Sequence, residues 1–246
     1  MCKSDDRVAL VVNQYCSNYD FFSYMMRIFC FVVAAVIRSM EKVEATIIGH
    51  SYVARLHRQF ENGSFVPRGP EELFYNFVGV GGARVCPPGG YKSIFRQVDE
   101  VRRRKPDIIF LHVGENDIGA EGVETYDIIE QIIRLVEMMI NECKPKVMLI
   151  GQLTEFPAHS RHGPVAKEVT RRLVHYVESR NHRFEGTKLK VWFHDIKING
   201  VNGGRFFDRD DIHLNPQGLH NYYKSVTAAV GRYARVVIED RKWDRR

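Results

Sequence analysis

The chain has 246 residues with 44% hydrophobic and 27% charged side chains, a composition typical of a globular domain and not of a disordered or fibrous chain. The formal net charge of +6 permits acidic partners but falls short of the signature of a dedicated nucleic-acid-binding protein. The five cysteines are widely spaced, odd in number and form no C-x-x-C pair, which argues against a disulfide framework. We therefore expect an intracellular, cytoplasmic protein.

The first forty residues differ from the rest of the chain. Residues 28–37 form an uninterrupted apolar run between Arg27 and Arg38, whereas a transmembrane helix needs about 20 predominantly apolar residues. The chain start also lacks the basic segment and small-residue cleavage site of a secretory signal. We interpret residues 1–42 as a leader or hydrophobic helix outside the core. Membrane association through residues 21–37, or secretion, is the alternative.

Beyond residue 42, short β-branched runs alternate with stretches of helical periodicity. Several of the runs are almost continuously hydrophobic, as expected for strands that are covered on both faces of a parallel sheet. Five such runs predict strands, at Val43 to Ile48, Leu73 to Val80, Asp107 to Val113, Lys146 to Gly151 and Leu189 to Asp195.

The stretches between these runs predict helices, at Ser93 to Arg104, Val123 to Cys143, Val165 to Phe184 and Gln217 to Val237. Alternating strands and helices imply right-handed crossovers and a three-layer α/β domain, here residues 43–237, followed by a frayed, charged tail at 238–246. In such domains ligands bind beyond the carboxyl ends of the strands. Functional residues are therefore expected in the loops that follow the strands.

Ser51 follows the first predicted strand and begins a helical stretch. A hydroxyl in this position lies at the rim of the sheet, and the N–H of Ser51 points out of the helix N-terminus, as a nucleophile and oxyanion donor would require. Serine also commonly caps helices, so a purely structural role remains open for this loop taken alone.

The next two loops offer candidate oxyanion donors. The second strand ends in Gly81-Gly82, where the backbone N–H groups can approach a ligand closely, and the third strand is followed by Asn116. Glycine and asparagine are also common turn formers, so each signal is weak by itself.

The last loop places a histidine three residues after a carboxylate. His213 follows Asp210 and directly precedes a helix with Asn215 as its cap and Pro216 at its first position. Pairing of the two side chains would fix the imidazole tautomer and stabilise the imidazolium. Asp208 and Asp211 compete with Asp210 for this role, and spacing does not exclude them.

The serine, the glycine, the asparagine and the Asp-His pair, in this order, resemble the four sequence blocks of the SGNH (GDSL-like) hydrolase family over roughly residues 43 to 237. The resemblance implies a flavodoxin-like α/β/α sandwich with a central five-stranded parallel sheet. It also implies a serine esterase that requires no metal or cofactor. By the same resemblance, Ser51 is the nucleophile, His213 the base and Asp210 its orienting partner, and the oxyanion donors are Ser51, Gly82 and Asn116.

One position departs from the family pattern. The family usually has aspartate before the nucleophile, where this chain has His50. Adjacent residues at a strand end point to opposite sides, so we expect His50 to play a structural role and not to serve Ser51 as base. The GHS form of this block, with VGVGGARV and D-x-x-H-L-N, looks like the esterase-like domains carried by some animal retrotransposons.

Other motifs have simpler interpretations. His159 and His162 have metal-like spacing, but a polar loop is the better interpretation because few other ligand residues are near in sequence. Pro87 to Gly90 and Gln152 to Gly163 are the expected substrate-facing loops.

Two rival functions remain: a catalytically weak or inactive binding module on the same fold, and a nucleic-acid-associated protein that uses the basic cluster Arg102 to Lys105. The expected partner is a small-molecule or acylated substrate, while the sequence leaves the oligomeric state open.

Overall fold

The computed structural model describes residues 23–29, 42–66, 68–155, 162–183, 189–196 and 203–244. The chain divides into two units, Met1–Lys42 and Val43–Arg246, which we describe separately. In the first unit, residues 23–29 are helical and exposed, and the remainder of the apolar run at 28–37 lies outside the described residues. Within the described part of the chain, no helix is both long and apolar enough to cross a membrane.

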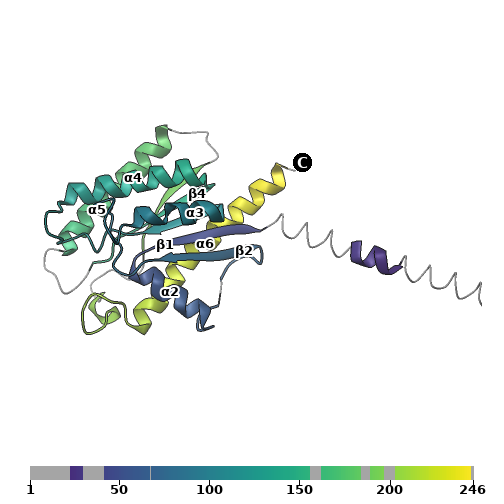
Figure 1. The fold of residues 1–246 in the computed structure, drawn as a ribbon, viewed down its shortest axis with the longest axis horizontal. Coiled ribbons are helices and arrows are strands. Elements are labelled where there is room, and N and C mark those ends of the chain that lie inside the picture. The colour runs from purple at the N-terminus through teal and green to yellow at the C-terminus, as the bar shows by residue number, and fades with distance from the viewer. Residues whose placement is uncertain are drawn as a thin grey trace, which may run out of the picture. The chain divides into compact units, whose positions relative to one another are not determined.

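The second unit is built on a parallel sheet of five strands with the order β2-β1-β3-β4-β5 (Figure 1). The strands lie within one or two residues of their predicted positions and confirm the expected sheet. Every residue of β3 and β4 is buried, which explains their continuous hydrophobic sequence. The strands are β1 (Val43–Gly49), β2 (Leu73–Gly79), β3 (Ile108–His112), β4 (Val147–Gly151) and β5 (Lys190–His194).

Helices cover both faces of the sheet, which confirms the three-layer α/β/α sandwich (Figure 1). One face packs against α2 (Ser51–Glu61) and α6 (Pro216–Trp243). The other packs against α3 (Val98–Arg104), α4 (Thr125–Cys143) and α5 (His162–Arg183). Two short 3₁₀ helices complete the described elements, η1 (Ile94–Gln97) and η2 (Gly203–Phe206). Each face buries its own hydrophobic cluster.

The C-terminal helix corrects one predicted boundary. Asn215 caps α6 as expected, since its side chain accepts a hydrogen bond from the Gly218 N–H. The helix then continues past Val237 to Trp243, so residues 238–243 are not a frayed tail. Ile238 packs against the core, and the Arg241 guanidinium lies 2.5 Å from the Asp107 carboxylate at the start of β3. These contacts extend the helix beyond the end of its apolar stripe.

The strand order places β1 between β2 and β3, and the connection from β1 to β2 and the connection from β2 to β3 run over opposite faces of the sheet. A crevice forms beyond the carboxyl ends of the strands at such a point. Close packing between α2 and the end of β2 brings the loops after β1 and β2 together at this edge of the sheet. A Cβ on Gly79 would lie only 2.3 Å from the backbone nitrogen of Ala54, so the end of β2 tolerates only glycine against α2.

Candidate active site

Ser51 is the first residue of α2, directly after β1. The cap position belongs to His50, whose backbone is extended and whose side chain makes no capping hydrogen bond. Ser51 is therefore not the cap residue that the structural interpretation required. Its N–H belongs to the first turn of the helix, where backbone N–H groups have no partner within the helix and can face an anion.

Asp210 is the carboxylate that contacts His213. Its Oδ2 lies 2.5 Å from Nδ1 of the imidazole, and its Oδ1 accepts hydrogen bonds from the backbone N–H groups of Ile212 and His213. The His213 N–H and imidazole, together with the Ile212 N–H, hold the pKa of Asp210 well below its ordinary value. Asp208 instead lies 3.5 Å from the Arg55 guanidinium. With Nδ1 engaged, Nε2 of His213 is the nitrogen left for proton transfer.

Two contacts attach the His213 loop to the helix that Ser51 begins. The Tyr52 hydroxyl donates a hydrogen bond of 2.7 Å to the carbonyl of Ile212, and Nη1 of Arg55 donates one of 3.2 Å to the carbonyl of Leu214. These carbonyls belong to the residues on either side of His213. The nucleophile and base candidates, 162 residues apart in sequence, therefore lie on segments that are bonded to each other.

The loops that follow β2 and β3 are also bonded to each other. Nδ2 of Asn116 donates a hydrogen bond of 2.9 Å to the carbonyl of Ala83, which places the amide beside Gly82. Gly82 has φ +70°, a conformation that favours glycine. The buried Asp117 carboxylate accepts from the N–H groups of Val85 and Cys86, and burial raises its pKa to about 6. The loops after β2 and β3 thus form one connected wall.

A cavity of about 380 Å³ opens beside Gly82 and Asn116. The predicted substrate-facing loop Pro87 to Gly90 contributes Pro87 and Gly90 to its lining, so this loop does reach the cavity. The other lining residues are Arg84, Cys86, Tyr91, Lys92 and Ser93. Of the second expected loop, Gln152–Glu155 are described, whereas residues 156–161 are not.

The alternation of side chains along a strand predicted that His50 points away from Ser51, but the structure places the two side chains close together. Its Nδ1 lies 3.4 Å from Ser51 Oγ, and its Nε2 lies 3.0 Å from Oε2 of Glu115. The rule fails because His50 occupies the cap position, where the chain has already left the pleat of the strand. The imidazole is 1% exposed, and burial lowers its pKa although Glu115 opposes the shift.

Glu115 is the buried centre of a network that the sequence analysis missed. Its Oε1 lies 2.6 Å from Nε2 of His112 and accepts hydrogen bonds from the backbone and hydroxyl of Thr154. His112 in turn contacts the Tyr222 hydroxyl at 3.0 Å. Burial alone would raise the pKa of Glu115, but the two histidines outweigh it and hold the pKa well below its ordinary value. The signals available in the sequence were an acidic residue in the loop after the third strand and a histidine in place of the family's usual aspartate.

His50, His112 and Glu115 also place possible ligand atoms within 4.8 Å of one another, a spacing compatible with a metal site. However, Nε2 of His112 faces both Glu115 Oε1 and the carbonyl of Gln152, the latter at 3.0 Å. A nitrogen between two oxygen acceptors carries a hydrogen, and a metal-bound nitrogen does not. The cluster therefore fits a hydrogen-bonded ionic network better than a metal centre. Of the other predicted histidines, His159 lies outside the described residues and His162 is buried at the start of α5.

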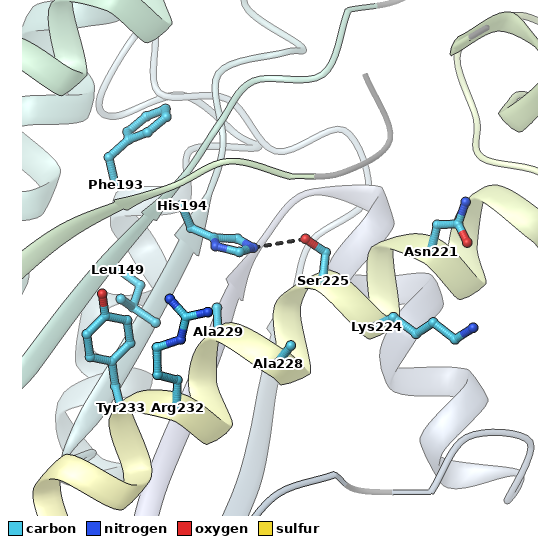
Figure 2. Close-up of a pocket in the computed structure, with 10 residues that line it drawn as sticks. All are labelled: Leu149, Phe193, His194, Asn221, Lys224, Ser225, Ala228, Ala229, Arg232 and Tyr233. Atoms are coloured by element: carbon cyan, nitrogen blue, oxygen red, sulfur yellow. Dashed lines mark hydrogen bonds between the residues drawn. The ribbon is translucent and has the colours of Figure 1, made fainter. Parts of the chain in front are cut away.

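A second serine–histidine contact lies elsewhere in the domain. Figure 2 shows His194, at the end of β5, and Ser225, on α6, pointing toward each other in a cavity of about 430 Å³. Nε2 of His194 is 2.9 Å from Ser225 Oγ, and burial lowers the pKa of His194 to about 4. Ser225 lies inside α6, where its backbone N–H is used in the helix and cannot face an oxyanion. This pair therefore lacks the amide donors that acyl transfer needs.

The fold and the arrangement of loops define the class: this is a domain with the α/β/α architecture of SGNH hydrolases. The model of the GDSL-like Lipase/Acylhydrolase family matches residues 47–220, well over half of the chain, and the chain belongs to this family. The matched range contains Ser51, Gly82, Asn116, Asp210 and His213. Family membership supports ester hydrolysis as the general chemistry.

Solved structures show the same fold at low sequence identity. An acetyl esterase mutant with acetate ion has a TM-score of 0.58 and 14% identity, covering 79% of this chain and 99% of the other. A lipase/acylhydrolase from Enterococcus faecalis has a TM-score of 0.55 and 14% identity, and the match covers 78% of this chain and 97% of the other. A carbohydrate esterase family 3 protein from Talaromyces cellulolyticus has a TM-score of 0.52 and 13% identity, and the match covers 80% of this chain and 99% of the other. No curated protein matches the chain.

Proposed function

We propose that this protein is a serine esterase that uses Ser51 as nucleophile, His213 as general base and Asp210 as the residue that orients the imidazole. One observation carries the proposal. The Asp210–His213 pair lies on a loop that is bonded, on both sides of His213, to the helix that Ser51 begins. A carboxylate-oriented imidazole that reaches the serine oxygen activates the hydroxyl for acyl transfer.

The reaction follows from the roles of these groups. His213 Nε2 takes the proton of the Ser51 hydroxyl as the oxygen attacks the ester carbonyl. The N–H groups of Ser51 and Gly82 and the amide of Asn116 stabilise the oxyanion that forms. The imidazolium then gives its proton to the leaving alcohol oxygen, which leaves an acyl-serine. A water molecule, deprotonated by the same imidazole, releases the acid and restores the hydroxyl.

The comparisons support a small acyl group as the first substrate to test. The similar structures include an acetyl esterase and a carbohydrate esterase, so acetyl esters are the natural starting panel. The nucleic-acid alternative remains a prediction. Within the described part of the chain, Arg102, Arg103 and Arg104 pair with acidic side chains of α3 and α4, as expected for a solvated helix end.

The experiment is labelling with a fluorophosphonate probe, which reacts only with an activated serine. Wild type and Ser225→Ala should be labelled and should hydrolyse 4-nitrophenyl acetate, whereas Ser51→Ala should do neither. Ser225 is a matched control because its hydroxyl, like that of Ser51, lies within hydrogen-bonding distance of an imidazole. Unchanged labelling or hydrolysis in a folded Ser51→Ala protein would refute the proposal. Absence of labelling in the wild type would favour the binding-module alternative.

A further inference from the structure

The cavity beside Gly82 and Asn116 carries an unbalanced positive charge. Arg84 and Lys92 both line it, and both side chains are exposed. Neither forms an ion pair with any residue in the described ranges, and no aspartate or glutamate is among the residues that line the cavity. Asp117 is buried in the same pair of loops, with its two oxygens bonded to backbone N–H groups. The charge of Arg84 lowers the pKa of Asp117 against the larger effect of burial, so Asp117 balances Arg84 only in part.

Backbone contacts join the two segments that carry these cations. The Arg84 N–H donates to the carbonyl of Lys92 at 3.0 Å, and the Ile94 N–H donates to the carbonyl of Arg84 at 2.9 Å. The strand-like pairing of residue 84 with residue 93 belongs to the same contact. The loop therefore fixes the positions from which both side chains reach the cavity, although the side chains themselves are long and exposed.

The Lys92 ammonium lies close to Gly82, the residue proposed as an oxyanion donor. Its Nζ is 3.1 Å from the point at which a Cβ on Gly82 would sit. The positive φ of Gly82 favours glycine at this position, and the Lys92 side chain packs against it. A charged group of a substrate that lies in the cavity would meet this ammonium while its carbonyl lies against Gly82 and Asn116.

We infer that the cavity binds an anionic group of the substrate, so that the protein prefers esters that carry a negative charge near the scissile carbonyl. This inference rests on the proposed esterase function and assigns Arg84 and Lys92 as specificity-determining residues. Two unpaired cations in a concave wall attract an anion more strongly than the same charges on a flat, fully hydrated surface. A carboxylate, sulfonate or phosphate would satisfy the same chemistry.

The test compares pairs of esters that differ in charge. On the alcohol side, 3-sulfonatophenyl acetate is compared with 3-(methylsulfonyl)phenyl acetate. On the acyl side, the monophenyl ester of adipic acid is compared with the phenyl ester of its monoamide. We expect the anionic member of at least one pair to have the higher kcat/KM. Differences in leaving group within a pair are the same in every variant, so changes in the anionic-to-neutral ratio report the charge on the protein.

Neutral variants locate the effect. Arg84→Gln and Lys92→Gln should each lower the anionic-to-neutral ratio of kcat/KM by roughly 5- to 50-fold, the range for losing one charge a few ångströms away. Arg235→Gln, which removes an exposed charge on α6 outside the cavity, should leave the ratio unchanged. Higher salt should reduce the preference in the wild type. The pair that responds tells whether the alcohol or the acyl part occupies the cavity.

The failures are distinguishable. If Ser51-dependent hydrolysis occurs but neither pair shows a charge preference that Arg84→Gln or Lys92→Gln reduces, the inference is wrong and the esterase proposal stands. If no Ser51-dependent hydrolysis is found, the esterase proposal fails. The cavity is then tested by calorimetric titration with benzenesulfonate against methyl phenyl sulfone. Binding of the sulfonate that Lys92→Gln weakens would support an anion site, and equal or absent binding of both probes would overturn it.

Discussion

Two imidazole–carboxylate pairs lie at the end of the sheet that carries Ser51, and they differ in their exposure to water. His213 and Asp210 lie on the surface loop before α6, with 34% and 46% of their side chains exposed. His50 and Glu115 are buried, with 1% and 0% exposed. The buried pair includes the residue next to Ser51 in sequence, whereas the exposed pair is brought there only by the fold.

The difference in exposure separates two roles. A general base must exchange protons with a leaving alcohol and with water, and only the exposed imidazole has access to both. His50 is enclosed, and burial lowers its pKa, so it remains neutral near pH 7. Its Nδ1 can accept the Ser51 hydroxyl hydrogen at 3.4 Å while its Nε2–H faces Glu115. We infer that His50 positions the hydroxyl and that His213 transfers the proton.

The largest expected effect comes from replacing each of the two histidines in turn. His213→Ala should lower kcat on the order of 10⁶-fold, because a serine without its base loses the cooperative unit. His50→Gln should lower kcat by about tenfold or less, since an amide can still accept a hydrogen bond. Hydrolysis of 4-nitrophenyl acetate by folded protein, checked by circular dichroism, measures both. Equal losses in the two variants would show that the comparison between the pairs is wrong.

The carboxylates extend the same contrast. Asp210→Asn should lower kcat by about 10² to 10⁴-fold, because the amide no longer favours the imidazole tautomer that leaves Nε2 free to accept a proton. The midpoint of thermal unfolding should hardly change, since exposed ion pairs add little stability. Asp208→Asn is the matched control in the same loop, because the Asp208 carboxylate faces Arg55, and only the Asp208 backbone N–H bonds to His213. A comparable loss of kcat in Asp208→Asn would reopen the choice among the three aspartates.

How much of this was predictable depended on whether a contact is local in sequence. The five strands and the Asp210-to-His213 spacing follow from hydrophobic runs and a three-residue interval, and both are visible without a structure. The Glu115 network was not predictable, because three segments of chain, at residues 50, 112–115 and 154, meet around one carboxylate. The end of α6 was misplaced because the charged residues after Val237 have partners that sequence does not reveal, such as Asp107 for Arg241.

Glu115→Gln probes the buried pair through stability. The carboxylate faces His50 at one oxygen and His112 and Thr154 at the other. An amide has one acceptor oxygen only, so its NH₂ group must meet an imidazole N–H or the Thr154 N–H. We expect the free energy of unfolding to fall by about 3 to 5 kcal/mol, as when one partner of a buried pair is removed. Urea titration measures it, with the exposed Glu121→Gln as control. An unfolding free energy equal to that of the wild type would mean that the Glu115 carboxylate does not stabilise the fold.

The smallest expected effect concerns how burial changes the response of an imidazole to acid. Burial lowers the pKa of His194 from 6.5 to about 4, so the unfolded chain binds a proton on this residue at a pH where the folded chain does not. Acid therefore favours unfolding, and the free energy of unfolding should fall by about 3 kcal/mol as the pH drops from about 6.5 to about 4. His50, whose pKa is also lowered, adds to the loss in the same direction. His194→Gln should flatten this dependence in urea titrations at successive pH values, whereas His57→Gln, on the exposed side of α2, should not. An identical slope in wild type and His194→Gln would show that burial of this imidazole does not govern acid stability.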